Sequence, residues 1–379
     1  MEDRMKKNII ILLLGVLLTS CGQTIDTETM VAWESPHGSI YNNGSSMNLP
    51  TPPLKVSWEF SLKDITHCEP VAGGGAVLLS DEKGLIYCLG ETDGLLIWSR
   101  QFGAGITIQP VISKGRVFLG DGGSQLFSID IGSGSVLWTK ELDSPIVGWP
   151  IVDTGRVWVC SSNSLYCFEE TAGTEIFSIK SPKNFTSAPS LQRYLYLVAG
   201  NSLQAVIPES GVLVWRRDFK NKIVGTVTCL SSGIIVCDGE LHILSDSKGE
   251  LLSDYKEEEG YLFTSSASIY VNLVVACNNK PEVVCFTKSP LQRLWSLAPI
   301  KLSNVAPVIG EKYVYFVSND GRLYCCKASD GQWQWHHQMG SKVVGLCPLE
   351  DHIVIVSELG LVKRLDIGGK PMTKDEMIK

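Results

Sequence analysis

The feature that most constrains this chain is an internal repeat of about 40 residues that runs through most of its length. Proline marks one register of the repeat at Pro70, Pro110, Pro150, Pro189, Pro307 and Pro348, with Thr228 and Ser266 at the two intervening positions. Tryptophan marks a second register at Trp58, Trp98, Trp138, Trp215, Trp295 and Trp335, with Phe177 and Asp254 as substitutes. Because two independent marks share one period, we expect a series of similar units, each packed against its neighbours.

Each repeat unit is typical of four short antiparallel strands, and the seventh unit shows the pattern best. Residues 313–317 form a β-rich run, 318–321 a hairpin turn, 322–326 a second strand and 332–335 the outer strand. A glycine recurs four residues before the tryptophan position, at Gly94, Gly134, Gly173, Gly211 and Gly331. No convincing amphipathic pattern of 3.6-residue period follows Cys21, so the sequence predicts an all-β fold.

The number of repeats predicts an eight-bladed β-propeller. Eight inner-strand positions run from Pro70 to Pro348, but the last unit, with strands at 353–356 and 361–365, lacks an outer tryptophan strand. An unpaired outer strand that contains Trp58 stands instead at residues 54–60. We expect this N-terminal strand to complete the last blade, since ring closure removes exposed sheet edges.

The N-terminus has the pattern of a secretory signal. Basic residues precede an apolar run at 9–18 that is too short to span a bilayer, and Leu18-Thr19-Ser20-Cys21-Gly22 resembles the lipobox of bacterial lipoproteins. A plain secretory signal with a chance cysteine is the alternative. We therefore expect a signal peptide at 1–20, a lipidated tether and lead-in at 21–53, the propeller at 54–369 and a polar tail at 370–379. Cys21 is the predicted lipidation site, and Gly22 beside it favours the outer membrane, with the protein facing the periplasm.

Composition excludes several classes of protein. With 44% hydrophobic and 19% charged residues the chain is not generally disordered, and a net charge of −7 gives no basic field for nucleic acid. Of twelve cysteines, those at Cys88, Cys167 and Cys285 sit in aliphatic or aromatic strand patterns, and no CxxC motif occurs. Cys325 and Cys326 are neighbours within one predicted strand, so they point to opposite faces. The cysteines therefore indicate small buried side chains rather than a disulfide framework or a zinc site.

These repeats resemble those of PQQ-type β-propellers. The resemblance rests on the run Leu-Tyr-Cys-Cys-Lys-Ala-Ser-Asp-Gly-Gln-Trp-Gln-Trp at 323–335, on Trp-Glu-Ser-Pro-His-Gly at 33–38 and on Leu-Lys-Val-Ser-Trp at 54–58. Eight such blades behind a lipobox are similar to the BamB family of lipoproteins, which belong to the outer-membrane β-barrel assembly machinery. The resemblance implies a lipid-anchored scaffold whose partner is an envelope protein, such as the periplasmic part of an outer-membrane assembly component.

The family resemblance also suggests where a partner would bind. In BamB-type proteins a mid-chain loop before a Ser-Ala-Pro contacts the assembly partner, and here Lys183, Asn184 and Phe185 precede Ser187-Ala188-Pro189. The family's leucine and arginine contacts are not reproduced in this loop. A second expected inter-blade loop, acidic in that family, carries Arg216, Arg217, Lys220 and Lys222. Trp149, which precedes Pro150, is a third candidate contact near a ring opening.

Each of these candidates has a plainer interpretation. The basic run at 216–222 is also typical of a solvated face, and Trp149 of simple packing. The acidic run at 256–259 fits a partner-facing loop or a merely degenerate fifth blade.

An enzyme of the quinone-dependent dehydrogenase class is the rival hypothesis. Such an enzyme would need a bound quinone, a metal and an acidic base, usually within a longer chain. The pair His336-His337 follows Trp335 at a strand end and is expected to be solvated rather than metal-binding. No nucleophile with a base is visible, so the sequence predicts no catalytic, cofactor-binding or metal-binding residues and favours a docking protein.

Overall fold

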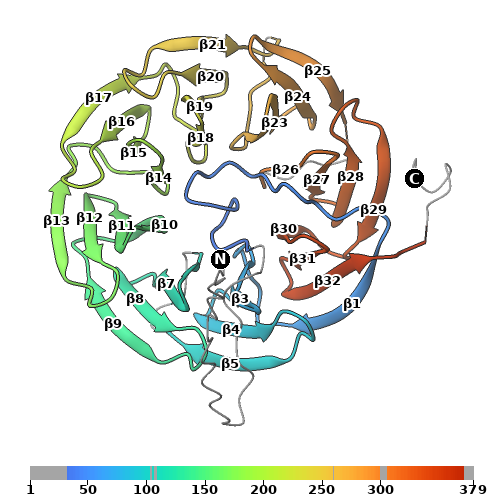
Figure 1. The fold of residues 1–379 in the computed structure, drawn as a ribbon, viewed down its shortest axis with the longest axis horizontal. Helices are drawn as coiled ribbons and strands as arrows, with labels where there is room; N and C mark the ends of the chain where they lie inside the picture. The colour runs from blue at the N-terminus through green and yellow to red at the C-terminus, as the bar shows by residue number, and fades with distance from the viewer. Residues whose placement is uncertain (1–31, 103–104, 106–108, 259, 299–304, 371–379) are drawn as a thin grey trace, which may run out of the picture.

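The computed structural model describes residues 32–102, 105, 109–258, 260–298 and 305–370, and all the regular structure in them is β-strand. The strands form eight antiparallel sheets of four strands each, which surround a central opening as the blades of a propeller (Figure 1). The predicted all-β, eight-bladed fold is confirmed.

The blades follow the chain, and within blades 1 to 7 the first strand lies at the centre and the fourth at the rim. Blades 1 to 4 comprise β2 (Val71–Gly73), β3 (Ala76–Ser80), β4 (Leu85–Gly90), β5 (Leu96–Gln101); β6 (Val111–Ser113), β7 (Arg116–Gly120), β8 (Gln125–Asp130), β9 (Val136–Glu141); β10 (Ile146–Asp153), β11 (Arg156–Ser161), β12 (Ser164–Glu169), β13 (Glu175–Lys180); and β14 (Ser190–Leu191), β15 (Leu195–Ala199), β16 (Ser202–Val206), β17 (Leu213–Asp218). Blades 5 to 8 comprise β18 (Thr228–Leu230), β19 (Gly233–Cys237), β20 (Leu241–Leu244), β21 (Leu251–Tyr255); β22 (Ser268–Tyr270), β23 (Leu273–Cys277), β24 (Val283–Lys288), β25 (Leu291–Leu297); β26 (Val308–Ile309), β27 (Tyr313–Ser318), β28 (Arg322–Lys327), β29 (Trp333–Gln338); and β30 (Val343–Pro348), β31 (His352–Ser357), β32 (Leu361–Ile367), β1 (Leu54–Ser61).

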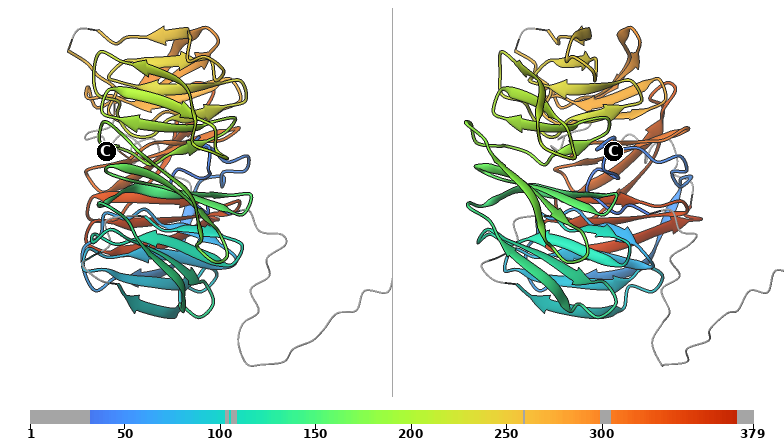
Figure 2. Two further views of the ribbon diagram at one scale, coloured as in Figure 1. Left: turned by 90° about the vertical axis from the view of Figure 1, so that its left-hand side faces the viewer. Right: turned by 60° about the vertical axis from the view of Figure 1, so that its left-hand side comes forward.

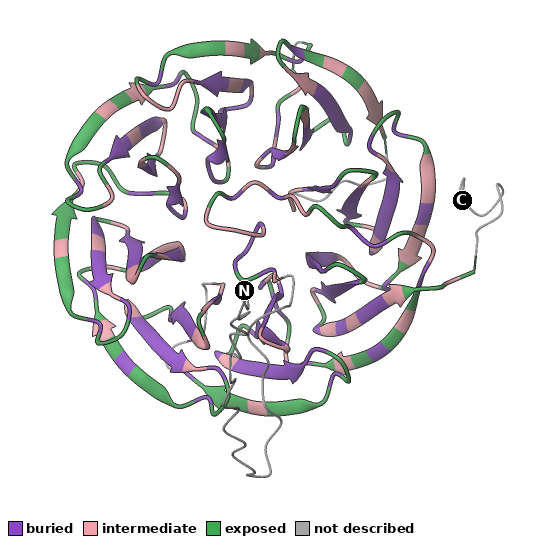
Figure 3. Cartoon of the chain, in the orientation of Figure 1, coloured by how far each residue is buried: buried purple, intermediate pink, exposed green. Residues whose placement is uncertain are grey.

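Burial follows the position of a strand within its blade (Figure 3). The second and third strands pack on both faces against neighbouring blades, so β3 is buried at every residue, whereas all but one residue of the outer strand β5 is exposed. This explains why the middle strands are nearly continuous apolar runs. All eleven described cysteines are buried and free, and they serve as small apolar side chains of this core or its edges.

The tryptophan and glycine marks of the sequence are two sides of one contact between neighbouring blades. The Trp98 ring of blade 1 lies under Gly134 of blade 2, where a Cβ would come within 2.7 Å of the indole and φ is 67°. The Trp98 Nε1 also donates a hydrogen bond to the Ile131 carbonyl, at 2.7 Å. The same ring-on-glycine contact joins Trp58 to Gly94, Trp138 to Gly173, Trp215 to Gly249 and Trp295 to Gly331. Only glycine combines the positive φ with this close approach.

Blade 3 keeps the contact of a ring with a glycine, between Phe177 and Gly211, but takes its inter-blade hydrogen bond from a different tryptophan. Its outer strand carries Phe177, which has no N–H to donate, but Trp158 on β11 donates from Nε1 to the Pro208 carbonyl of blade 4 at 2.9 Å. The hydrogen bond between blades is thus kept although the repeat mark is lost.

The ring closes through the N-terminal strand, as the sequence predicts. β1 pairs with β32 in antiparallel register and completes the blade that β30 and β31 begin. Trp58 on β1 is only 8% exposed and donates from Nε1 to the Glu91 carbonyl of blade 1 at 3.0 Å. One residue therefore joins the first and last blades.

We expect Trp58→Ala to lower the free energy of unfolding by roughly 3–5 kcal/mol, since a buried aromatic ring and an inter-blade hydrogen bond are both removed. Lys55→Ala on the same strand, where the side chain is exposed, is the matched control and should change it by less than about 0.5 kcal/mol. Chemical denaturation of both variants measures the difference, and equal midpoints would contradict this closure scheme.

Residues 32–50, named here the channel segment, cross the central opening and bond to the inner strands of six blades (Figure 1). Its carbonyls accept hydrogen bonds of 2.7–3.0 Å from the amides of Ala72, Ile112, Leu191, Cys229, Ile269 and Ile309, in blades 1, 2, 4, 5, 6 and 7. The sequence predicts a tether and lead-in over 21–53. Its described part, from residue 32, is instead bonded to the ring along much of its length.

Polar side chains of the channel segment are buried at its turns. Asn42 is fully buried and donates from Nδ2 to the Pro189 carbonyl and to the Ser190 hydroxyl, at 3.1 and 2.7 Å. The His37 Nε2 lies 3.0 Å from the Ser268 hydroxyl. Both residues have positive φ, 60° at His37 and 48° at Asn42, which lets the segment bend from blade to blade.

The buried His37 makes the fold sensitive to acid. Burial lowers the pKa of its imidazole to about 4 from the usual 6.5. Below pH 6.5 the unfolded chain binds a proton that the folded chain refuses, so the free energy of unfolding falls as the pH drops from 6.5 toward 4. Burial raises the pKa of the neighbouring Glu69 carboxyl to about 7. This shift has the opposite effect, because it makes the free energy of unfolding fall as the pH rises toward 7.

We therefore expect His37→Asn, which tolerates the same positive φ, to show a smaller drop in thermal midpoint than the wild type between about pH 7 and about pH 5. His67→Asn, at an exposed histidine, is the control and should leave that drop unchanged. Differential scanning calorimetry at the two pH values compares the slopes. An unchanged slope in the His37 variant would show that the buried imidazole does not couple folding to pH.

Candidate docking surface

The two faces of the ring carry different parts of the chain. Because strands alternate in direction, one face holds the described connections from an outer strand to the next inner strand, and the other holds the turns between the first two strands of each blade. We name the first the loop face. The channel segment lies toward the second face, as the edge-on views show (Figure 2). All of the candidate contact residues in the loops therefore belong to one face.

The loop at 181–188 presents two of the three residues predicted there. Lys183 and Asn184 are exposed, but Phe185 is only 5% exposed and packs in one core cluster with Trp158 and Leu191. Its amide also donates to the Ser162 carbonyl at 2.9 Å, which fixes the residue beneath the loop. The prediction that Phe185 contacts a partner is wrong, because its ring completes the core between blades 3 and 4.

Trp149 lies beside the same loop and is half-buried. It packs against the core clusters on both sides of blade 3, one of which contains Phe185. The loop can approach because Gly148, at φ 65°, has no side chain, and a Cβ there would meet the Ala188 amide nitrogen at 2.3 Å. The indole Nε1 is buried without a hydrogen-bond partner among the described residues. Packing against blade 3 accounts for most of the burial of the Trp149 side chain. Its contact with a partner stays a prediction.

Arg216 and Arg217 lie on the outer strand β17, not on an inter-blade loop as predicted. Both arginines lie near the C-terminal end of β17, which is close to the loop face. Arg216 donates from Nη2 to the Asp218 carboxylate at 2.9 Å, and the Lys183 Nζ lies 3.8 Å from the same carboxylate. The hydrogen bond from Arg216 is the largest cause of the lowered pKa of Asp218. The structure thus brings Lys183 and Arg216 together across two blades.

Arg217 has a largely structural role. Its guanidinium lies 5.7 Å from the centre of the Phe219 ring and donates to the Gly249 carbonyl of blade 5 at 2.8 Å. Lys220 and Lys222, which follow in the loop, are exposed and have no ion-pair partner among the described residues. We name Lys183, Asn184, Arg216, Lys220 and Lys222 the basic patch, because two cations lie against Asp218 and two more follow in the next loop, where the Asn221 amide donates to the Asp238 carboxylate at 3.2 Å.

The acidic run after blade 5 is partly structural. Glu257 is buried and lies 3.5 Å from the Arg293 guanidinium, and it accepts a hydrogen bond from the Asn278 amide at 3.1 Å. Glu258 is exposed, whereas Glu259 lies outside the described residues. The buried ion pair gives this degenerate blade a polar core contact.

Comparison with known families decides the class of this ring. The family model "Outer membrane protein assembly factor BamB" matches residues 55–148 and 144–337 of this chain. The chain belongs to the BamB family. No curated protein matches it by sequence.

Solved structures share the fold of this BamB-family chain at low sequence identity. BamB from Moraxella catarrhalis superposes with a TM-score of 0.70 at 16% identity, covering 85% of this chain and 100% of its own. The quinohemoprotein alcohol dehydrogenase from Comamonas testosteroni superposes with a TM-score of 0.74 at 12% identity, covering 90% and 81%. A computationally designed protein, Ika8, has a TM-score of 0.71 at 15% identity over 85% and 100%. Identities this low show the fold alone.

The described residues of this BamB-family ring include few side chains that a quinone-dependent enzyme could use. Cys325 and Cys326 lie within strand β28 and belong to different core clusters, so they point to opposite faces as predicted. His336 and His337 are half-buried, and the His337 ring stacks on Trp335, so the pair is only partly solvated. Within the described ranges, no group of three His, Cys, Asp or Glu residues could hold a metal ion.

The predicted anchor cannot be placed. Cys21 and the rest of the signal segment lie outside the described residues. In the part of the chain that is described, no helix is long and apolar enough to cross a membrane.

Proposed function

We propose that this chain is a lipid-anchored docking protein that faces the periplasm and serves outer-membrane protein assembly by holding an envelope protein. Its membership of the BamB family over residues 55–337 is the observation that carries the proposal. The lipobox-like run that ends in Cys21 and Gly22 supports anchoring at the outer membrane.

The basic patch is the proposed contact surface for that partner. It concentrates cations on a chain of net charge −7, so it would attract an acidic surface of the partner. The loop that carries Lys183 and Asn184 is fixed from below by the buried Phe185 ring. A patch held in this way loses little conformational entropy when a partner binds.

The docking proposal is tested by Lys183→Glu combined with Arg216→Glu. This variant should lose most recovery of an envelope protein that crosslinks to the wild-type chain in cells, because two attractive charges become repulsive beside Asp218. Lys248→Glu with Lys312→Glu is the matched control, since both lysines are exposed in turns of the opposite face. Quantitative mass spectrometry of the crosslinked material compares the three proteins.

Equal recovery from both double variants would refute the basic patch as the contact surface. The absorption spectrum of the same wild-type preparation separates the second hypothesis. A stoichiometric bound quinone, together with unchanged partner recovery, would favour the dehydrogenase class.

The anchoring proposal is tested by Cys21→Ala. Without the thiol that carries the lipid, the chain should leave the membrane fraction or remain unprocessed. Fractionation of cells and the mass of the N-terminal peptide of the wild type measure this. A wild-type N-terminal peptide without added lipid mass would show that the plain secretory signal is the correct interpretation.

A further inference from the structure

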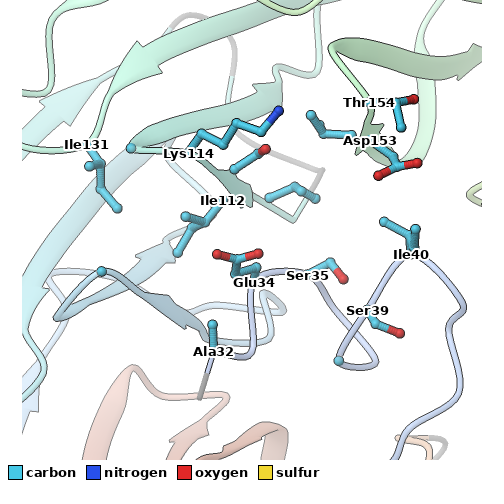
Figure 4. Close-up of a pocket in the computed structure, with 16 residues that line it drawn as sticks. Ala32, Glu34, Ser35, Ser39, Ile40, Ile112, Lys114, Ile131, Asp153 and Thr154 are labelled. Atoms are coloured by element: carbon cyan, nitrogen blue, oxygen red, sulfur yellow. The ribbon is translucent and has the colours of Figure 1, made fainter. Parts of the chain in front are cut away.

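A cavity of about 800 Å³ lies where the channel segment passes blades 2 and 3 (Figure 4). Ile112, Ile40 and Val152 contribute apolar walls, and Glu34, Lys114 and Asp153 contribute charged groups. Glu34 and Ile40 come from the channel segment, whereas Lys114 comes from the first turn of blade 2 and Asp153 ends strand β10 of blade 3. The volume is in the range of small-molecule sites.

The cavity exists because the channel segment skips blade 3. It bonds to blade 2 through the Glu34 carbonyl and to blade 4 through the Ile40 carbonyl, and between them it makes a turn in which the Gly38 amide donates to the Ser35 carbonyl. Val152 pairs with Val157 in the same register that Ile112 has with Val117. Its amide therefore faces the opening as the Ile112 amide does, but no carbonyl of the described channel segment accepts from it.

The charges of the cavity do not balance. The Lys114 Nζ is 3.2 Å from the Glu170 carboxylate, which also accepts a hydrogen bond from the Ser113 hydroxyl, so this cation is already neutralised. Glu34 and Asp153 have no ion-pair partner among the described residues, and burial raises the pKa of Glu34. An anion would meet two carboxylates here without a free cation.

A buried hydroxyl beside Glu34 is also unpaired. Ser35 lines the cavity, is 3% exposed, and its Oγ has no hydrogen-bond partner among the described residues. Buried polar atoms of folded proteins are nearly always hydrogen-bonded, so this hydroxyl is a polar group of the cavity wall whose bonding a water molecule or a ligand can complete.

We propose that this cavity binds a protonated amine on an aliphatic stem, either a free alkylamine or the lysine side chain of an extended peptide. The carboxylates of Glu34 and Asp153 accept hydrogen bonds from the ammonium group, and Ile40 and Ile112 flank the stem. A peptide would in addition place a backbone carbonyl opposite the Val152 amide and so supply, in blade 3, the inner-strand contact that the channel segment makes in six other blades. This inference is independent of the docking proposal, which concerns the opposite face of the ring.

Titration calorimetry of the full chain with four probes tests the proposal. The probes are n-hexylammonium, the neutral 1-hexanol, the peptide Ala-Val-Lys-Val-Ala and the same peptide with an acetylated lysine. Hexylammonium should bind at least about tenfold more tightly than hexanol, since a paired charge in a partly buried site is worth more than about 1.4 kcal/mol. A further tenfold gain for the lysine peptide, lost on acetylation, would identify a peptide ligand, and no gain would identify a free amine.

Variants of the carboxylates provide the second arm. Glu34→Gln should weaken hexylammonium binding at least about tenfold while leaving the thermal midpoint nearly unchanged, because the Glu34 side chain is exposed and has no ion-pair partner among the described residues. Glu175→Gln, at an exposed position on β13, is the control and should change neither. If Glu34→Gln fails to fold, Asp153→Asn replaces it, with weaker amine binding again expected.

Two results would overturn the proposal. One is equal binding of hexanol and hexylammonium, or no binding of any amine probe. The other is amine binding that persists unchanged in the folded carboxylate variant. Neither result depends on partner recovery by the basic patch, so the two proposals fail separately.

Discussion

The contact between a tryptophan ring and the glycine of the next blade is the interaction on which the ring depends. A four-stranded sheet of this size buries too little apolar surface to be stable on its own. Each blade must therefore pack against its neighbour at a fixed distance and rotation. Trp98 on Gly134 sets both, since the ring rests on a backbone without a side chain and its N–H is held by the Ile131 carbonyl. This geometry recurs at five of the eight junctions between blades, and Trp58 on Gly94 uses it to close the circle.

The ring that results leaves a row of inner-strand amides around an axial opening, and the channel segment follows from that constraint. Buried backbone donors without partners are costly, and carbonyls of residues 33–44 pair with six of them. Blades 3 and 8 are the exceptions, and in blade 3 the amide of Val152 faces a cavity that also contains two unpaired carboxylates. The same physical requirement therefore explains both the segment that fills the channel and the place where it leaves room for a ligand.

The sequence predicted the features of the fold that repeat in each blade and missed the features that occur only once. The blade number and the closure by Trp58 were predictable because proline, glycine and tryptophan recur at a fixed spacing. The channel segment has no period, since His37, Gly38 and Asn42 bend it differently at each blade, so its composition indicated only a tether. Phe185 was misassigned for a related reason: in a loop flanked by polar residues nothing in the sequence shows that Gly148 lets the loop approach the core.

The distribution of charge separates two binding surfaces on one rigid body. On the loop face, Lys183 and Arg216 converge on Asp218 from two blades, a meeting that depends on strand register and that no spacing in the sequence reveals. On the opposite face, Glu34 and Asp153 line a cavity whose only lysine is already paired. Because the blades between them are joined by stiff ring-on-glycine contacts, a ligand in the cavity would not need to move the basic patch. The fold can thus present a preformed cationic surface and an anionic pocket at once, each complementary to a different class of partner.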